Sequence, residues 1–355
     1  MFNSQLNSRF TEKEAHPYFI ADIGANHDGS LSRALDLINL VAESGGHAAK
    51  FQHFEAKTLV SERGFRKLGR NLAHQAAWTK SVFEVYEDAT IDLEWTNALV
   101  RECEKVNIDF FTSAYSQSLV DFIDPYVDVF KIGSGDITWT DLISHTASKG
   151  KPIILATGAS TLEDITRAVQ TVEILGNNLC IMQCNTNYSG SVENFKHINL
   201  RALLTFRKRF PQHTLGLSDH TPGHATVLGA QALGAVIFEK HFTDRNDRVG
   251  PDHGFAMNPA SWAEMIARST ELHLALGHGA KIIEANELES VIVQRRALCA
   301  AKELKDGVII KADDLDYLRP CPPNGIPPYD AEKLVGKRLV KPMRTGEHFT
   351  WQLVK

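Results

Sequence analysis

Short apolar runs alternate with stretches of helical periodicity over most of the chain, from about Tyr18 to Phe242. Each run is bounded by polar or glycine-containing turns, as buried strands are. The runs predict strands at Tyr18–Gly24, Ala48–Phe54, Asp109–Ser113, Val129–Ser134, Pro152–Gly158, Leu179–Asn185, Thr214–His220 and Val236–Phe242. Apolar residues recurring on one helical face predict helices at Leu31–Glu43, Asp92–Val106, Trp139–Ser148, Leu162–Leu175, Leu200–Phe210, Thr226–Leu233 and Pro259–Leu276.

This alternation of eight strands with helices predicts a (β/α)8 (TIM) barrel, an α/β fold. A doubly wound open sheet is the competing architecture, but the glycine-rich first turn of that fold is not present. The segment Glu55–Thr90, after the second strand, is long and rich in charged and aromatic residues. Extended βα loops are usually functional, so we interpret this segment as part of an active-site wall.

The pattern changes after Gly277. A helical stretch, Ala280–Val293, leads into short apolar segments at Arg296–Ala301, Val308–Ile310, Leu334–Lys341 and Glu347–Leu353, interrupted by a proline-rich turn region, Arg319–Tyr329. We therefore predict an N-terminal solvated arm (1–17), a barrel domain (18–279), a linker helix (280–294) and a compact β-rich domain (295–355). Because so small a domain holds little core alone, we expect it to pack on its own barrel or on a partner's.

Composition narrows the classes of partner. The 355 residues carry a net charge of -5, which gives no reason to expect nucleic acid or an anionic membrane as a partner. No apolar run approaches the ~20 residues that span a bilayer, and the N-terminus lacks a signal-peptide core. Five cysteines without repeated spacing argue against a disulfide framework. We expect a cytoplasmic protein.

Two histidines follow neighbouring predicted strands, in Gly216–His220 and Ile237–Phe242. Parallel strands joined by one helix are expected to be neighbours, so His220 and His241 should emerge side by side at the same end of the barrel. Two imidazoles there can hold a divalent metal and leave coordination positions open to substrate. The alternative is that each is a satisfied strand-end histidine.

Two lysines lie inside otherwise apolar strands, Lys50 in AAKFQ and Lys131 in VFKIGS, where a cation is costly unless it is paired or binds an anion. Lys131 with nearby hydroxyls suits a phosphate or carboxylate; structural ion pairs are the alternative. Because the C-terminal ends of barrel strands form the active site, the pattern predicts a metal-dependent enzyme acting on a small anionic substrate. The hydroxyl residues grouped with Lys131 are Thr112, Ser134 and Ser218, and other polar strand-end residues are Asp22, Asn26, His27, Gln52, Ser113, Asp136, Thr157, Asn185, Tyr188, Asp219 and Glu239.

After the last strand, Thr243–His253 carries mixed charge and a Gly-Pro turn, as does a loop that folds over a polar ligand. A solvated loop with incidental ion pairs is equally consistent with this local pattern.

Several motifs in fixed order resemble the sialic-acid (nonulosonate) synthase family. They are IADIGANHDGSL (20–31), AAKFQ (48–52), FKIGSGD (130–136), KPIILATG (151–158), GLSDHT (216–221) and FEKHFTDRNDRVGPDH (238–253). The tail, 296–354, resembles that family's C-terminal antifreeze-like (SAF) domain, with Arg319–Pro320 and Asn324–Ile326 as its RP…NGI element. The resemblance covers nearly the whole chain.

The resemblance implies condensation of phosphoenolpyruvate with an open-chain N-acyl hexosamine to a nine-carbon α-keto acid and phosphate. It implies a divalent metal on His220 and His241, most often Mn²⁺, with Mg²⁺ or Co²⁺ as alternatives. It also implies a domain-swapped homodimer, in which Arg319 reaches the sugar of the other subunit. The implied catalytic residues are Asp22, Lys50, His220 and His241; the phosphoenolpyruvate-binding residues are Lys50, Thr112, Lys131, Ser134 and Ser218; and the sugar-binding residues are Gln52, Asp136, Thr186, Tyr188, Asp252 and Arg319.

Three departures from the family pattern matter, one at the implied catalytic residue Asp22 and two among the implied sugar contacts. Asp22 and Asp136 stand where glutamate is frequent, and Thr186 stands two residues before Tyr188 in a varied CT(N/S)xY segment. An extra Cys-Pro-Pro also follows Pro320. The exact hexosamine therefore stays open between N-acetylmannosamine, a deoxy-diamino sugar and a phosphorylated form. The other functional readings are a different metal-dependent phosphoenolpyruvate-using barrel enzyme and a non-enzymatic carbohydrate-binding protein.

Overall fold

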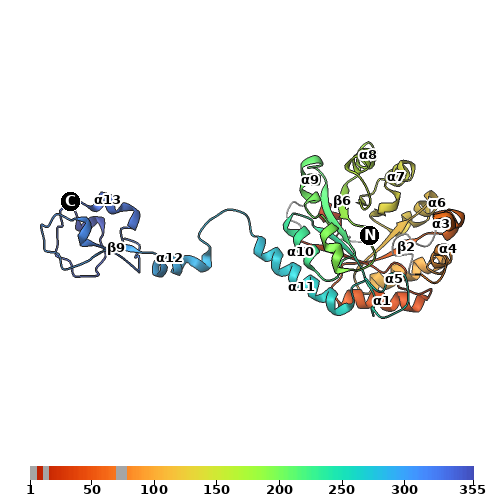
Figure 1. Ribbon diagram of the computed structural model, residues 1–355, viewed down its shortest axis with the longest axis horizontal. Helices are drawn as coiled ribbons and strands as arrows, with labels where there is room; N and C mark the ends of the chain where they lie inside the picture. The colour runs from red at the N-terminus through yellow and green to blue at the C-terminus, as the bar shows by residue number, and fades with distance from the viewer. Residues whose placement is uncertain (1–5, 11–15, 69–77) are drawn as a thin grey trace. The chain divides into compact units, whose positions relative to one another are not determined.

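The computed structural model describes residues 6–10, 16–68 and 78–355. The chain divides into two compact units, Met1–Gly277 and His278–Lys355. In the first unit, eight parallel strands close into a barrel in sequence order, which confirms the predicted fold (Figure 1). The strands are β1 (Tyr18–Asp22), β2 (Ala48–His53), β3 (Asp109–Ala114), β4 (Phe130–Ile132), β5 (Ile153–Ala156), β6 (Leu179–Cys184), β7 (Thr214–Asp219) and β8 (Ile237–His241).

Most strands end one or two residues before their predicted limit, because the polar residues at their C-terminal ends already belong to the loops above the barrel. His220, for example, lies one residue beyond β7. Helices surround the barrel as a ring, and one follows each strand (Figure 1). They are α1 (Leu31–Glu43), α5 (Thr96–Lys105), α6 (Gln117–Ile123), α7 (Thr140–Ala147), α8 (Leu162–Glu173), α9 (Ala202–Arg209), α10 (Ala225–Ala232) and α11 (Pro259–Leu276).

Helix α6 is absent from the sequence-based prediction. It has seven residues, too few to establish a helical period, and its start is marked by Ser116, whose side chain accepts a hydrogen bond from the backbone N–H of Leu119. An N-terminal cap of this kind is the signal that periodicity alone overlooks.

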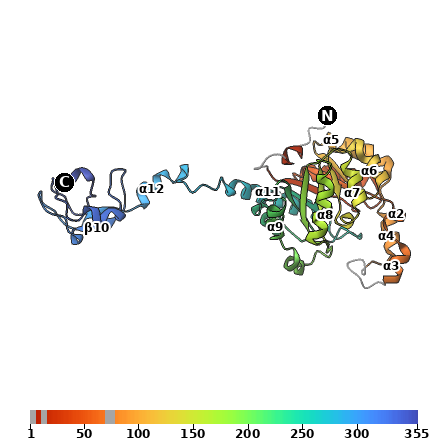
Figure 2. The same cartoon turned by 90° about the horizontal axis from the view of Figure 1, so that it is seen from above.

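The barrel interior is filled at its N-terminal end by a buried cluster that includes Leu6, Tyr18, Ile20 and Phe111. Leu6 is only 1% exposed. The expectation of a solvated arm over 1–17 is therefore wrong for Leu6, and residues 1–5 and 11–15 of that arm lie outside the described residues. Figure 2 shows the short 3-10 helix η1 (Asn7–Phe10) at the opposite end of the barrel from α3 and α4.

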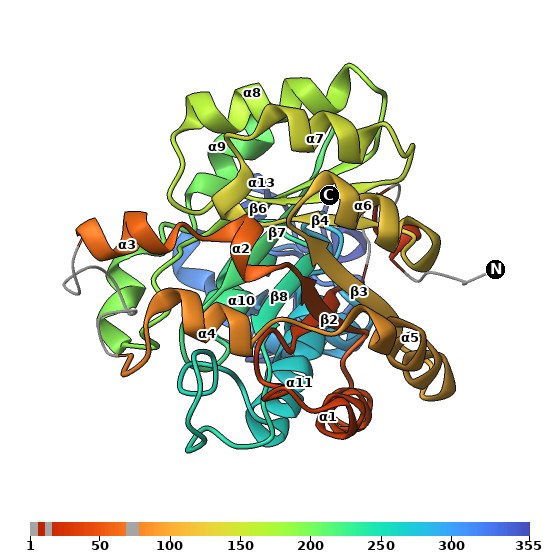
Figure 3. The same cartoon turned by 90° about the vertical axis from the view of Figure 1, so that its right-hand side faces the viewer.

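Three short helices occupy the long segment between β2 and α5, where the sequence predicted an extended loop: α2 (Ala56–Leu59), α3 (Glu62–Leu68) and α4 (Val82–Asp88). Figures 2 and 3 show them grouped apart from the outer ring of helices. Helix α4 begins with a capping box, in which the Ser81 and Glu84 side chains satisfy each other's backbone N–H groups. Residues 69–77 of the predicted wall lie outside the described residues.

The second unit contains an antiparallel pair, β9 (Ala297–Ala300) and β10 (Leu315–Leu318), and its own buried apolar cluster. The strands predicted at Val308–Ile310, Leu334–Lys341 and Glu347–Leu353 appear only as single bridges, such as Ile309 to Arg338 and Leu339 to Val354. Two helices lie here, α12 (Leu288–Gln294) and α13 (Ala331–Leu334); α12 is shorter than the helix predicted over Ala280–Val293. Within the described parts of both units, every helix is too short or too polar to cross a membrane.

Candidate active site at the carboxyl ends of the barrel strands

A cavity of about 440 Å³ opens at the C-terminal ends of the barrel strands, where a barrel enzyme carries its active site. Most of the residues singled out from the sequence meet in it. Those that line it are Asp22, Lys50, Gln52, Lys131, Ser134, Asp136, Tyr188, Ser218, His220, His241 and Asp252.

Four charged side chains from four strands form the floor of this cavity, and we call Asp22, Lys50, Lys131 and Glu239 the floor cluster. The Lys50 ammonium lies 2.5 Å from Asp22 Oδ2 and 3.9 Å from Glu239 Oε2. The Lys131 ammonium donates to both oxygens of Glu239 at 2.6 Å. Since an ammonium has three N–H donors, each lysine keeps donor capacity for an anion in the cavity.

Three members of the floor cluster, Asp22, Glu239 and Lys50, are held in their ionised forms. Burial alone raises the pKa of Asp22, but Lys50 and His241 outweigh it and the net pKa is lowered. Burial likewise raises the pKa of Glu239, and the two lysines reverse the sign. The pKa of Lys50, which burial alone lowers, is raised by Asp22 and Glu239. The cavity therefore presents two ammonium groups, each balanced by carboxylate.

The two histidines lie side by side, as the sequence predicted, because β7 and β8 pair in the register Asp219 to Lys240 just before them. Their ring centroids are 5.4 Å apart. His220 Nδ1 lies 2.8 Å from the carbonyl oxygen of Asn185, so an Nδ1–H donates there and Nε2 is left as an acceptor. Burial, assisted by His241, lowers the pKa of His220 to about 4, which keeps this imidazole neutral.

His241 lies between two carboxylates. Its Nε2 is 3.5 Å from Asp22 Oδ2 and its Nδ1 is 3.6 Å from Asp252 Oδ2. The buried Nδ1 has no hydrogen-bond partner among the described residues. Among the described residues, no group of three His, Cys, Asp or Glu side chains could hold a metal ion by itself. A neutral His220 and an unsatisfied His241 nitrogen nevertheless fit a divalent ion that completes its coordination with water or substrate oxygens.

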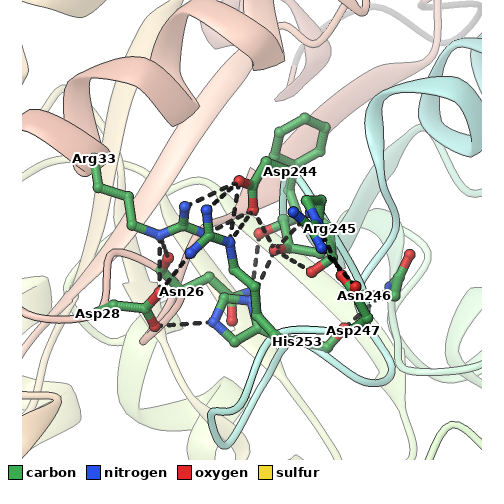
Figure 4. Close-up of polar contacts among 11 residues, drawn as sticks. Asn26, Asp28, Arg33, Asp244, Arg245, Asn246, Asp247 and His253 are labelled. Carbon is green, nitrogen blue, oxygen red and sulfur yellow. Dashed lines mark hydrogen bonds and ion pairs between the residues drawn. The ribbon is translucent and has the colours of Figure 1, made fainter.

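A second charged network, which we call the rim cluster, joins Asp28, Arg33, Asp244, Arg248 and His253; Figure 4 labels all of them except Arg248. Arg33 donates from Nη1 and Nη2 to the two oxygens of Asp244, at 3.0 and 2.6 Å. Its Nε lies 2.9 Å from Asp28 Oδ2, and His253 Nε2 lies 2.9 Å from Asp28 Oδ1. Figure 4 shows how these contacts tie the loop after β8 to the β1–α1 loop.

The rim cluster holds the loop segment that carries Asp252. This carboxylate accepts a hydrogen bond from the backbone N–H of Ala25, with an N–O distance of 3.1 Å. A side chain at Gly24 would meet it, since a Cβ there would lie 2.7 Å from Asp252 Oδ2. Gly24 also has φ of +51°, a backbone conformation that glycine adopts readily. Thr243–His253 thus contributes Pro251 and Asp252 to the cavity lining, and the ion pairs of Asp244 and His253 with Arg33 and Asp28 tie it to the residues after β1.

Thr112 does not lie in the cavity. Its hydroxyl is 2.7 Å from His53 Nδ1, on the helix-facing side of the sheet, and it is absent from the lining. The neighbouring Ser113 lines the cavity instead and pairs in register with Gln52 and Lys131. Side chains alternate between the two faces of a strand, so the choice of Thr112 as an anion ligand was wrong by one residue.

Thr186 and Arg319, both predicted as sugar ligands, belong to different units of the chain. Thr186 packs its methyl group against Gly158, where a Cβ would lie only 2.5 Å away, and does not line the cavity. Arg319 is exposed at the end of β10 in the second unit. Its role at the sugar stays a prediction.

One feature was missed from the sequence. Glu239 was noted at a strand end but given no role, although it pairs with Lys131 and accepts from the Ser218 hydroxyl at 3.2 Å. The available signal was an acidic residue inside an otherwise apolar strand, where a charge needs a partner. The aromatic lining around Phe54, Tyr86 and Tyr115 was predicted in part, because Tyr86 belongs to the segment Glu55–Thr90 that we interpreted as an active-site wall.

The sequence models of two known families match this chain. The sequence model of the NeuB family matches residues 37–281, and that of the SAF domain matches residues 295–355. The chain belongs to the NeuB family. As a family member, it is 31% identical over 344 residues to N,N'-diacetyllegionaminic acid synthase of Legionella pneumophila, with 95% of this chain and 94% of that protein covered.

A second relative and a solved structure are also similar to this chain. Human N-acetylneuraminate-9-phosphate synthase is 30% identical over 341 residues, with 96% of this chain and 93% of that protein covered. The crystal structure of the N-acetylneuraminic acid synthetase of Leptospira borgpetersenii in complex with citrate superposes with a TM-score of 0.68 at 26% identity. That comparison covers 78% of this chain and 91% of the Leptospira chain.

Proposed function

We propose that this protein is a nonulosonic acid synthase, which condenses phosphoenolpyruvate with an open-chain N-acyl hexosamine. The products are a nine-carbon α-keto acid and phosphate. One observation carries the proposal: the paired lysines and the paired histidines line a single cavity. Family membership over nearly the whole chain agrees with it.

The floor cluster suits phosphoenolpyruvate. Lys50 and Lys131 supply the charge for its phosphate and carboxylate, and Ser113, Ser134 and Ser218 supply hydroxyl donors at the same level of the barrel. The Ser134 hydroxyl is itself fixed, because it accepts a hydrogen bond from the backbone N–H of Gly158 at 2.8 Å. Ser113 takes the place that the sequence had given to Thr112.

In the proposed reaction, C3 of phosphoenolpyruvate attacks the aldehyde carbon of the sugar. Water then adds at C2, and phosphate leaves with cleavage of the C–O bond. Asp22 is the ionised carboxylate nearest to both Lys50 and His241, so it can orient the lysine and accept a proton from water. Gln52 donates to Asp22 Oδ2 at 3.2 Å and fixes its orientation.

We further propose that His220 and His241 hold a divalent metal, Mn²⁺ or a similar ion. When bound, such an ion polarises an aldehyde oxygen. The chain's own residues prepare the pair: Asn185 fixes the tautomer of His220, and Tyr188 packs on its ring with centroids 4.2 Å apart.

Phosphate release from phosphoenolpyruvate, measured with and without an N-acyl hexosamine and followed by mass detection of the keto acid, tests the function. We expect release only when the sugar is present. Release without sugar, or none with any hexosamine, would contradict the proposal.

His241→Ala tests the metal. It should abolish turnover and lower the bound Mn²⁺ measured by elemental analysis, with His145→Ala, a change on the outer helix α7, as the control. Unchanged Mn²⁺ content would remove His241 from the metal site.

The homodimer and the reach of Arg319 into the partner's site form a separate proposal. Arg319→Ala should raise the KM for the sugar and leave that for phosphoenolpyruvate unchanged. Light scattering of the full chain should give twice the monomer mass. A collapse in phosphoenolpyruvate affinity would place Arg319 in a different role.

A further inference from the structure

Among the residues that the structure describes, one side of the cavity is lined without a charged side chain. The described residues of the segment between β2 and α5 contribute only apolar and aromatic side chains to the lining. The aromatic rings contact one another: centroids are 5.6 Å apart for Phe54 and Tyr86, and 6.4 Å for Trp78 and Tyr86. We call the side chains of this segment the apolar wall; they are Phe54, Leu59, Val60, Phe65, Trp78, Val85, Tyr86 and Ala89.

The same segment is rich in charged residues, but the described ones point away from the cavity. They pair on the outer surface, as Lys57 does with Glu55, Arg66 with Glu62 and Lys80 with Asp88. Over the described lining, the only cationic or ionisable nitrogen side chains are Lys50, Lys131, His220 and His241. All four belong to the floor and to the histidine pair.

The apolar faces of α3 and α4 lack a protein partner that covers them fully. Neither helix contains a fully buried side chain, and Phe65, Val85 and Tyr86 are half-buried where they line the cavity. Apolar area facing a cavity is stabilised when a ligand removes it from water, at roughly 25 cal/mol per Å². The wall is therefore built for contact with apolar groups.

The floor fixes how a sugar meets this wall. Phosphoenolpyruvate occupies the lysines, so the aldehyde carbon must lie close to the floor and the histidine pair. The end of the sugar remote from that carbon then extends toward the mouth, which the wall lines. This step rests on the proposed function.

We propose that the apolar wall selects a hexosamine whose remote end carries apolar groups, such as a second N-acyl group or a terminal methyl in place of a hydroxymethyl. This wall disfavours a phosphorylated hexosamine, because phosphate against its described side chains loses water without gaining a cation from them, which is costly. Known relatives include one named for a 9-phosphate product and one named for an N,N'-diacetyl product. The wall places this chain with the second kind of chemistry.

The test compares three sugars at saturating phosphoenolpyruvate: N-acetylmannosamine, its 6-phosphate and a 2,4-diacetamido-2,4,6-trideoxyhexose. We expect kcat/KM for the diacetamido sugar to exceed that for N-acetylmannosamine by about tenfold or more. One additional apolar group bound in an apolar pocket raises kcat/KM by about that factor. The 6-phosphate should be the poorest substrate. A preference for the 6-phosphate, or equal use of all three, overturns the inference while leaving the proposed function intact. Absence of turnover with every sugar counts against the proposed function itself.

Two variants of one wall residue sharpen the result. Phe65→Ala should lower kcat/KM for the diacetamido sugar several-fold and barely change that for N-acetylmannosamine. Phe65→Lys places a cation in the wall and should narrow the gap between the 6-phosphate and the diacetamido sugar. Ile174→Ala, an exposed apolar change at the end of α8, is the control and should alter neither ratio. Equal loss on all sugars in Phe65→Ala, with an unchanged melting temperature, would show that the wall does not discriminate.

Discussion

The floor cluster and the rim cluster are two charged networks at the mouth of the same barrel, and they differ in burial. Floor side chains are at most 6% exposed, whereas Asp28 and Arg248 in the rim are 32% and 38% exposed. The floor joins neighbouring strands β1 and β2 through Asp22 and Lys50, joins β4 to β8 across the barrel through Lys131 and Glu239, and lines the cavity. The rim joins a helix to a loop and lies outside the lining, next to Asp252 in sequence.

Because they differ in burial, the floor cluster and the rim cluster use ion pairs for different purposes. A buried cation that keeps free donors beside a cavity can exchange part of its carboxylate contact for an anionic substrate. The bidentate pair of the rim, Arg33 with Asp244, is 14% and 21% exposed and therefore more accessible to water and salt than the floor pairs are, and its fixed geometry can hold a loop in place. The floor should therefore control chemistry and folding together, whereas the rim should control only the position of Asp252.

The largest effect is expected from Lys131→Met. It removes one phosphoenolpyruvate ligand and leaves Glu239 buried without its main partner. Turnover should fall by about 10²–10³-fold, the cost of losing one preorganised charge-stabilising donor. Stability should fall by about 3–5 kcal/mol, as when one member of a buried pair is removed. Steady-state phosphate release and urea unfolding measure the two quantities.

The double variant Lys131→Met/Glu239→Gln separates these two effects. Without the unpaired carboxylate, much of the lost stability should return, but turnover should stay low because the cation is still missing. If turnover recovered together with stability, Lys131 would be a structural residue and the distinction between floor and rim would fail.

The barrel itself could be predicted from the sequence because each strand is an apolar run with a polar end, and these patterns are local. The neighbouring positions of His220 and His241 followed from the same topology. Helix α6 was missed because seven residues do not establish a period. The single bridges of the second unit, such as Leu304 to Met343, also leave no periodic trace.

The site was harder to predict wherever a choice between adjacent residues mattered. Thr112 and Ser113 carry the same chemistry, and only the register with Gln52 shows which hydroxyl faces the cavity. The pairing of Lys131 with Glu239 links residues 108 positions apart, so no local pattern reveals it. The rim cluster likewise joins Arg33 to Asp244 across 211 positions.

A smaller and more selective effect is expected from Asp244→Asn. The Arg33 guanidinium, which holds the pKa of Asp244 well below its ordinary value, loses its bidentate partner. The loop that carries Asp252 should then shift, and the KM for the sugar should rise about tenfold or more, as for a misplaced contact. The KM for phosphoenolpyruvate and the melting temperature should change little. Arg33→Lys, which keeps the charge but not the two-point contact, should give an intermediate KM; a rise in both KM values would contradict a positioning role.

Asp136 offers a further test of the comparison between floor and rim. Its carboxyl lines the cavity, but unlike the floor carboxylates it forms no ion pair with a lysine among the described residues. Burial raises its pKa to about 6, so the folded state holds this proton more tightly than the unfolded state does. The resulting stabilisation is complete below pH ~4, the ordinary pKa, and is lost as the pH rises through about 6. Asp136→Asn should therefore raise the melting temperature at pH 7.5 relative to the parent and give no such gain at pH 4. An equal gain at both pH values would show that the effect does not come from ionisation.

The smallest effect is expected from Asp247→Asn, on the same loop as Asp244. Asp247 pairs with Arg245, two residues away, and both side chains are about two-thirds exposed. This pair links the loop only to itself, so its loss should leave the melting temperature and both KM values unchanged within error. Because the variant removes the same charge as Asp244→Asn, it separates the pairing with Arg33 from the net charge of the loop. If the KM for the sugar rose as much as in Asp244→Asn, loop charge rather than the link to α1 would position Asp252, and the rim cluster would lose the role assigned to it.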